Sequence, residues 1–169
     1  MRQERQRVFE TNSSSTHSIC IVKCNKSELV LPDKLTFRCG EFGWEWMRYS
    51  DMDTKASYLY TAILLLYSPT VIEDLKRQLY DWLAQDGIDA DFEEPVKNER
   101  YDYYENIDID HVGETRDFVE AVIHSKTRLY RYLFSDKSFV LTGNDNEWDE
   151  DRNVDINVDY KHEEYYKSN

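Results

Sequence analysis

The sequence predicts an α+β fold, in which an antiparallel sheet from N- and C-terminal strands packs on about three helices. The order of the elements leads to this prediction. Strand-like segments come first, three helical stretches occupy the middle, and strand-like segments return near the end. With 169 residues, of which 40% are hydrophobic, the chain is long enough for one domain with a core, so we expect a single domain over residues 1–169.

The N-terminal part of the chain predicts three short strands. Runs of β-branched and aromatic residues are separated there by Ser, Asn and Gly residues. The predicted strands span residues 7–10, 18–23 and 35–39. In the segment that follows, GEFGWEW, the rings of Phe42, Trp44 and Trp46 share one face if the chain is extended.

The first predicted helix runs from Lys55 to Tyr67 and should be the buried centre of the fold. It is apolar almost all round, which is typical of a helix without a solvent face. Ser50, three residues before Asp53, loosely resembles a capping box at its start. The sequence Ser-Pro at residues 68–69 should end it, because the residue before a proline disfavours helical geometry.

Two further helices show clear apolar periodicity. Thr70 and Glu73 form the capping-box pattern of the second helix, which Asp86 and Gly87 should end. Its apolar residues recur at helical spacing: Ile72, Leu75, Leu79, Trp82 and Leu83. The third helix is expected over residues 115–134, with its apolar residues on one side.

The C-terminal part returns to strand patterns. Residues 138–142 predict one strand, and residues 153–160 alternate apolar and polar side chains with a period of two. Residues 107–110 alternate in the same way, because Ile107 and Ile109 alternate with Asp108 and Asp110. The N- and C-terminal strands together form the predicted antiparallel sheet.

Composition limits the cellular setting. No apolar stretch approaches the roughly 20 residues that a membrane span needs. The N-terminus, MRQERQRVFE, is charged and lacks the apolar region of a secretion signal. Three cysteines in such a chain indicate reduced thiols, so we expect a cytoplasmic protein. No cofactor is expected.

The negative charge is concentrated in two segments. The formal net charge is −13. Residues 86–120 hold 13 Asp and Glu against 3 Lys and Arg, a local net charge of −10, and residues 143–169 hold 9 against 3, a local net charge of −6. Together they carry −16, so the rest of the chain carries about +3. Both segments would repel a nucleic acid and attract a basic protein.

Carboxylates on an exposed strand face can form regular rows of charge. At positions i and i+2 they lie about 6.6 Å apart. Such a row imitates a nucleic-acid backbone for a protein with a Lys/Arg channel, whereas the simpler interpretation is a solvated surface. Tyrosines interleaved among the acids favour a contact surface. The predicted partner-binding residues are Asp108, Asp110, Glu147, Asp149, Glu150, Asp151, Asp155 and Asp159.

The hydroxyl-rich stretch ETNSSSTHSIC, residues 10–20, leaves three interpretations open. As a nucleophilic site it would use Ser14 with His17 as the base, although no G-x-S-x-G elbow is present. As an anion site it would bind phosphate through hydroxyls and turn N–H groups, with the residues Asn12, Ser13, Ser14 and Ser15. As a structural loop it would hydrogen-bond its own backbone.

Neither zinc nor calcium is expected. Cys20 and Cys24 would lie about 13 Å apart on a strand, whereas two thiolates on one zinc lie within about 4.6 Å. The acidic run that begins at Asp145 resembles the start of a calcium loop. Its sixth and twelfth positions are Glu150 and Ile156, where that loop needs Gly and Glu.

Three stretches, VFETNSSSTHSI, GEFGWEW and TKASYLYTA, together resemble a group of small proteins from phages and prophages of Gram-positive bacteria. The resemblance covers the first third of the chain and brings no catalytic residues with it. It implies a phage-encoded accessory protein. Small acidic proteins from such genomes are often antagonists of host defence, including inhibitors of CRISPR effectors.

The charge pattern and the resemblance together predict a binding protein and not an enzyme. We expect an anti-CRISPR-like, acidic nucleic-acid mimic that occupies the basic channel of a host protein such as a CRISPR effector nuclease. It would bind neither nucleic acid nor membrane directly. The alternatives are an enzyme or phosphate-binding protein that acts through residues 12–18, and a phage structural or assembly factor that self-associates through Trp44 and Trp46.

Overall fold

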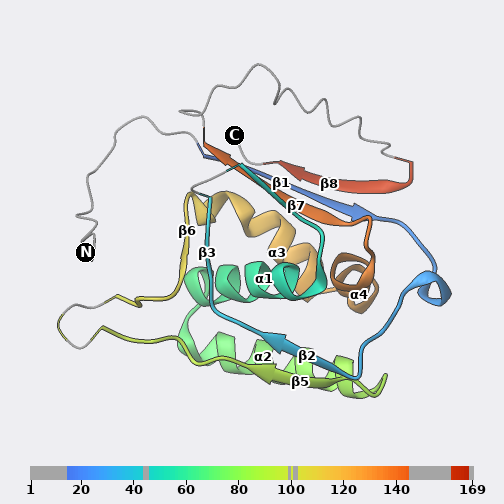
Figure 1. Cartoon of the computed structure of the whole chain (residues 1–169). Helices are drawn as coiled ribbons and strands as arrows, with labels where there is room; N and C mark the ends of the chain where they lie inside the picture. Colours follow the sequence, from blue (N-terminus) through green and yellow to red (C-terminus); the bar gives the residue numbers. More distant parts are fainter. Residues whose placement is uncertain (1–14, 44–45, 99, 101–102, 145–160, 168–169) are drawn as a thin grey trace.

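The chain folds into layers around a central group of helices (Figure 1). The computed structural model describes residues 15–43, 46–98, 100, 103–144 and 161–167. A four-stranded sheet covers one side of helices α1, α3 and α4, and a pair of parallel strands with helix α2 lies on the other side. The predicted strands at 7–10 and 153–160 lie outside the described residues.

The four-stranded sheet unites the two ends of the chain, as predicted. Its strand order is β4-β7-β1-β8, and every neighbouring pair is antiparallel. The strands are β1 (Ser15–Val22), β4 (Met47–Tyr49), β7 (Phe139–Asn144) and β8 (Glu163–Lys167). In the register, Cys20 lies opposite Phe139 on one side and Tyr165 on the other. The α+β prediction is confirmed.

Two short strand pairs stand apart from this sheet, and both are parallel. β2 (Lys34–Phe37) pairs with β5 (Asp89–Phe92), and β3 (Glu41–Phe42) pairs with β6 (Asp108–Ile109). The strand predicted at residues 35–39 is present as β2, outside the four-stranded sheet. Helices α1 and α2 lie between β2 and β5 in the chain, and such a long crossover brings strands together in parallel.

Helix α1 (Met52–Leu66) is the buried centre of the fold, as predicted. Residues 55–63 are all buried. The cap is Asp51 and not Ser50: the Asp51 carboxylate accepts a hydrogen bond from the backbone N–H of Thr54 at 2.8 Å. An ionised acceptor at a helix N-terminus also interacts well with the helix dipole.

Helix α2 (Pro69–Ala84) begins earlier than its capping-box pattern predicted. Ser68 is the N-cap and Pro69 occupies the first helical position, where its missing N–H costs nothing. Leu75, Leu79 and Leu83 recur every four residues and are buried. Gly87, with φ of +78°, ends the helix as predicted, because glycine adopts this left-handed conformation without strain.

The expected third helix is two helices. The short 3₁₀ turn η2 (Val112–Thr115) leads into α3 (Arg116–Ile123), and α4 (Lys126–Phe134) follows after a break. Ser125 causes the break, since its hydroxyl accepts a hydrogen bond from the backbone N–H of Arg128 and caps the new helix. The structure therefore contains four α-helices in the described residues.

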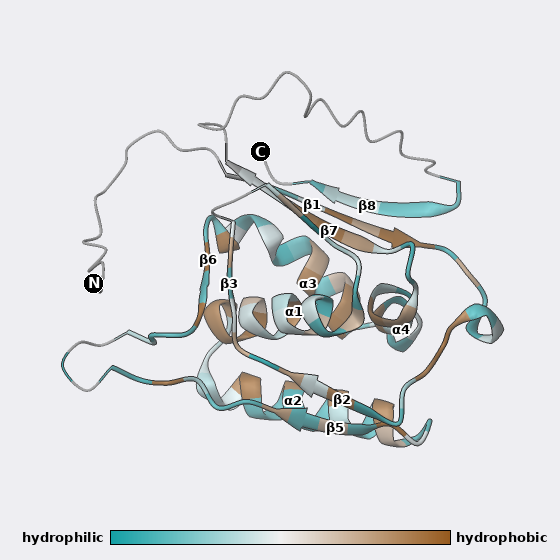
Figure 2. Ribbon diagram, in the orientation of Figure 1, coloured by the Kyte–Doolittle hydropathy of each residue, from teal (hydrophilic) through white to brown (hydrophobic). Residues whose placement is uncertain are grey.

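The core is rich in aromatic rings and lies between the sheet and the β2–β5 pair. Phe118 packs edge-on against Tyr132, with 4.9 Å between the ring centroids, and Phe37 stacks on Phe92, with 4.8 Å between the centroids. Figure 2 shows hydrophobic residues on the central helices and on β1 and β7, whereas β8 is hydrophilic. Among the described residues, no helix is long and apolar enough to span a membrane.

Candidate functional site

His17, the expected base of the hydroxyl-rich stretch, joins three elements of the fold. Its Nδ1 lies 3.0 Å from the hydroxyl of Tyr58 in α1, and its Nε2 lies 2.6 Å from the backbone carbonyl of Asp110, just after β6. Because a carbonyl oxygen can only accept, Nε2 carries the proton and Nδ1 accepts from Tyr58. The side chain is fully buried, and this burial lowers the pKa of His17 below 6.5.

This arrangement makes His17 a neutral structural residue. Gly43, with φ of +103°, approaches the ring so closely that a Cβ there would lie 3.3 Å from its Cε1. Among the described residues, one ring nitrogen has the buried Tyr58 as its partner and the other has the carbonyl of the half-buried Asp110. Ser15 begins β1 opposite Asn144, and the other members of the predicted anion and nucleophile sites, residues 12–14, lie outside the described residues.

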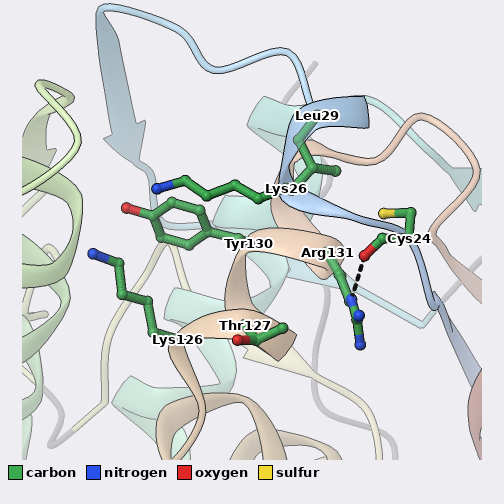
Figure 3. Close-up of a pocket in the computed structure, with 7 residues that line it drawn as sticks. All are labelled: Cys24, Lys26, Leu29, Lys126, Thr127, Tyr130 and Arg131. Carbon is green, nitrogen blue, oxygen red and sulfur yellow. Dashed lines mark hydrogen bonds between the residues drawn. The ribbon is translucent and has the colours of Figure 1, made fainter.

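A pocket of about 270 Å³ lies between the short 3₁₀ helix η1 (Lys26–Glu28) and α4 (Figure 3). Its walls include the ring of Tyr130 and the side chains of Lys26 and Lys126 on either side of that ring. The two ammonium nitrogens lie 5.6 and 5.2 Å from the ring centroid. This cation-rich site was not predicted from the sequence.

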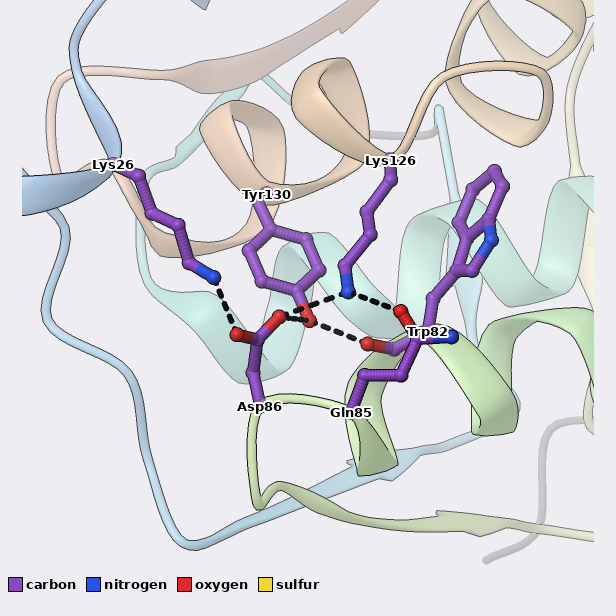
Figure 4. Close-up of polar contacts among 6 residues, drawn as sticks. All are labelled: Lys26, Trp82, Gln85, Asp86, Lys126 and Tyr130. Carbon is purple, nitrogen blue, oxygen red and sulfur yellow. Dashed lines mark hydrogen bonds and ion pairs between the residues drawn. The ribbon is translucent and has the colours of Figure 1, made fainter.

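Asp86 binds the same two lysines and does not belong to an acidic surface (Figure 4). Its carboxylate accepts from Lys26, from Lys126 at 2.9 Å, and from the Tyr130 hydroxyl at 2.8 Å. These donors hold the pKa of Asp86 well below its usual range. Asp86 therefore links η1, α2 and α4.

Two other carboxylates of the segment 86–120 also have lysine partners. Asp91 pairs with Lys34 at 2.9 Å, and Glu94 pairs with Lys76 at 2.8 Å. All these groups except Lys76 are more than half exposed, and exposed ion pairs contribute little stability. A cationic partner could therefore replace Lys34 at small cost.

The clearest row of carboxylates lies along β5, at residues that the sequence reasoning did not select. Asp89, Asp91 and Glu93 are exposed, and they alternate with the buried Ala90 and the half-buried Phe92. Successive carboxylates on such a face lie about 6.6 Å apart. The period-two pattern of the sequence DADFE, applied as at residues 107–110, would have found this row.

The predicted partner-binding residues Asp108 and Asp110 are both half-buried. Asp108 lies in β6 opposite Glu41 of β3, so two carboxylates are neighbours across this parallel pair. Asp110 follows the end of β6, where its carbonyl accepts from His17. The other six predicted residues, which begin with Glu147 and end with Asp159, lie outside the described residues.

Exposed tyrosines accompany the acidic residues in a hairpin that projects from the body (Figure 1). Lys97 pairs with Tyr104 in an antiparallel bridge, and the N–H of Glu105 donates to the carbonyl of Val96 at 2.9 Å. Val96 is 51% exposed, and Tyr103 and Tyr104 are each 41% exposed. We call these residues, with their neighbours, the hairpin 95–106; positions 99, 101 and 102 are not described.

Cys20, Cys39 and Trp46 are at least partly buried. Burial raises the pKa of Cys20 to about 12 and that of Cys39 to about 11. Within the described ranges, no group of three His, Cys, Asp or Glu side chains is arranged to hold a metal ion. Trp46 is half-buried over Gly143, where a Cβ would lie 2.8 Å from the indole ring, and Trp44 is not described.

Comparison of the chain with known proteins found no similar protein. No protein-family model matches the chain, and no curated protein or solved structure matches it at a significant level.

Proposed function

We propose that this protein is a phage-encoded antagonist of host defence that docks its acidic surface into the basic nucleic-acid channel of a host protein. The partner class that we favour is a CRISPR effector nuclease, which holds its heteroduplex in a positively charged channel. One observation carries the proposal: the two acidic segments bear −16 against about +3 for the rest of the chain. Charge concentrated in two segments attracts a cationic partner to the surfaces that those segments form.

The exposed row on β5 gives this charge a regular spacing. Asp89 and Asp91 lie on one face of the strand, and Glu93 follows directly after it, where its carboxylate accepts from the backbone N–H of Cys39. Within the described part of the chain β5 pairs only with β2. Lysine and arginine side chains of a channel that follows a phosphate backbone would meet these carboxylates in turn.

The hairpin 95–106 supplies contact area beside the charges. Tyrosine is enriched at protein interfaces because it buries a large ring and keeps a polar hydroxyl. Tyr103 and Tyr104 lie half-exposed on this projecting element, within the acidic segment 86–120. Neutral contacts of this kind would add affinity that does not depend on salt.

Charge reversal on β5 tests the proposal against a matched control. The test variant is Asp89→Lys with Asp91→Lys, and the control is Asp74→Lys with Asp81→Lys on the exposed surface of α2. Each variant changes the net charge by the same amount, and each breaks one exposed ion pair, Asp91–Lys34 or Asp74–Arg77.

Binding to guide-loaded CRISPR effector nucleases is measured at low and at high salt. We expect the β5 variant to bind at least about tenfold more weakly at low salt and with a flatter salt dependence, because charges at an interface act mainly through steering. The α2 variant should bind like the wild type. Equal affinities for the wild type and both variants would contradict docking through β5.

The same comparison extends to the C-terminal acidic segment. Asp149→Lys, Glu150→Lys and Asp151→Lys together change the local charge by six units. We expect this triple variant also to lose affinity at low salt. Inhibition that survives the triple change and the β5 change intact would show that nucleic-acid mimicry is wrong.

A further inference from the structure

We propose that the pocket between η1 and α4 binds a small organic anion: a phosphate or carboxylate group carried on a short apolar body. This site is separate from the acidic docking surface. Its volume of about 270 Å³ is near the lower end of the range for small-molecule pockets. The pocket therefore suits a compact ligand and not a polymer.

The charge of the pocket is opposite to that of the protein. The ionisable residues that line it, apart from Cys24 and Tyr130, are the cations Lys26, Lys126 and Arg131. Asp86 does not line the pocket, and its carboxylate binds both ammonium groups. Three cations against one carboxylate leave a net charge of +2 on a chain whose formal charge is −13. This complementarity selects an anion.

The guanidinium of Arg131 is held in place for such a contact. Its Nε donates to the backbone carbonyl of Cys24 at 2.9 Å, which fixes the side chain between α4 and the end of β1 (Figure 3). In the described structure this is the only hydrogen bond of the guanidinium, so its two terminal nitrogens remain as donors. Arginine can bind a carboxylate or a phosphate with two parallel hydrogen bonds.

The start of helix α4 adds to the positive potential. Acidic residues are favoured in the first turn of a helix because they compensate its dipole. The first turn of α4 contains no acid and carries Lys126 and Arg128. Thr127, which also lines the pocket, supplies a hydroxyl there.

The rest of the pocket wall is apolar, so a ligand that fits it should carry an apolar group. Leu29 is half-buried in the wall formed by η1, and the ring of Tyr130 lies between the side chains of the two lysines. An inorganic ion would leave this surface wet, whereas an alkyl or aryl group would cover it. Burial of apolar area then adds affinity to the ionic contact.

The test is a titration followed by ¹H–¹⁵N correlation spectra, with phenyl phosphate and phenylacetate as probes. Inorganic phosphate lacks the apolar body, and benzyl alcohol lacks the charge. We expect both organic anions to shift the resonances of Lys26, Lys126, Thr127 and Tyr130, and to bind at least about tenfold more tightly than inorganic phosphate or benzyl alcohol. The proposal would be overturned if inorganic phosphate or benzyl alcohol bound as tightly as the two organic anions.

Variants give opposite expected effects at the same site. Lys126→Gln should weaken phenyl phosphate binding several-fold, and Asp86→Asn should strengthen it, because the pocket charge rises from +2 to +3. The control Arg77→Gln removes an exposed cation from α2 and should change nothing. Loss of binding in Asp86→Asn with an unchanged spectrum, or equal weakening by the control, would contradict an anion site. Binding of an acidic peptide but of neither organic anion would also overturn it.

Discussion

The hydroxyl of Tyr58 donates a hydrogen bond to Nδ1 of His17 inside the core, with 3.0 Å between the two atoms. This bond joins the central helix α1 to the N-terminal strand β1. The other ring nitrogen donates to the carbonyl of Asp110, so one imidazole ties three elements together. A buried polar group that loses its hydrogen-bond partner lowers the stability of the fold. In the described residues, the histidine that the hydroxyl-rich sequence offered as a catalytic base links β1, α1 and the end of β6.

Removal of the tyrosine hydroxyl should destabilise the fold. In Tyr58→Phe the Nδ1 atom of His17 loses its donor inside the core, and one unsatisfied buried group costs about 1–3 kcal/mol. Urea denaturation should therefore show a lower free energy of unfolding with an unchanged slope. Tyr80→Phe on the exposed side of α2 is the control and should be close to neutral. Equal stability of the two variants would argue against the His17–Tyr58 hydrogen bond.

His17 should make the protein sensitive to mild acid. Burial lowers its pKa below 6.5 in the folded state, so the unfolded chain takes up the proton first as pH falls. The contribution of His17 to stability is therefore complete above pH 6.5 and falls as pH drops below that value. Relative to His17→Gln, the wild type should lose free energy of unfolding below pH 6.5. A constant difference between the two from pH 7 to 5 would contradict a buried neutral histidine.

Lys55 should have an effect on stability in the alkaline range. It is 1% exposed and donates to the carbonyls of Ser135, at 2.6 Å, and Ser138, at 3.2 Å. Burial lowers its pKa from 10.5 to about 8. Between these values the unfolded chain holds more protons, so the contribution of Lys55 to the free energy of unfolding rises with pH.

The test compares the wild type with Lys55→Met, in which this rise is absent. Between pH 8 and 10.5 the free energy of unfolding of the wild type should rise relative to that of the variant. The rise should be at most on the order of 3 kcal/mol, because each unit of pKa shift corresponds to about 1.36 kcal/mol. The tyrosines and cysteines titrate in both proteins and largely cancel. Lys137→Met, at an exposed position of the neighbouring turn, should show no such shift. A flat difference for Lys55→Met would contradict a buried amine.

Asp86 should stabilise the contact between η1 and the helices. Asp86→Asn replaces the ionised acceptor of two lysines and a tyrosine by a neutral amide, and we expect a loss of about 1 kcal/mol. Because the folded-state pKa of Asp86 lies below 3.8, this contribution is complete above that pH and disappears as pH falls further. Asp81→Asn, on the exposed side of α2, is the control for the thermal or urea measurement. Loss of the same size in the control would argue against the contact.

The sequence predicted those elements whose pattern is strong and local. The apolar stretch at residues 55–67 identified the buried helix α1, and the run of β-branched residues at 18–23 identified β1. Helix boundaries were less accurate because several residues compete for the cap: Asp51 lies next to Ser50, and Ser68 with Pro69 precedes the capping-box pattern at residues 70–73. The break before Ser125 was missed because apolar residues continue with helical spacing across it.

The remaining features depend on contacts between distant parts of the chain. Strand β8, with the sequence EEYYK, shows no apolar alternation and pairs with β1 only because the fold brings the chain ends together. The ion pairs of Asp86 join residues 60 and 40 positions apart, so neither the neutralised carboxylate nor the cationic pocket has a local pattern. The exposed row on β5 did have one, in the alternation of Asp89, Asp91 and Glu93 with apolar residues.

Competition with nucleic acid tests the proposed function most directly. The binding of this protein to a guide-loaded CRISPR effector nuclease is measured at a series of concentrations of the matching DNA target. If its carboxylates occupy the nucleic-acid channel, the apparent dissociation constant should rise linearly with the DNA concentration, and no complex should contain both. A stable complex of effector, target DNA and this protein together would contradict the account.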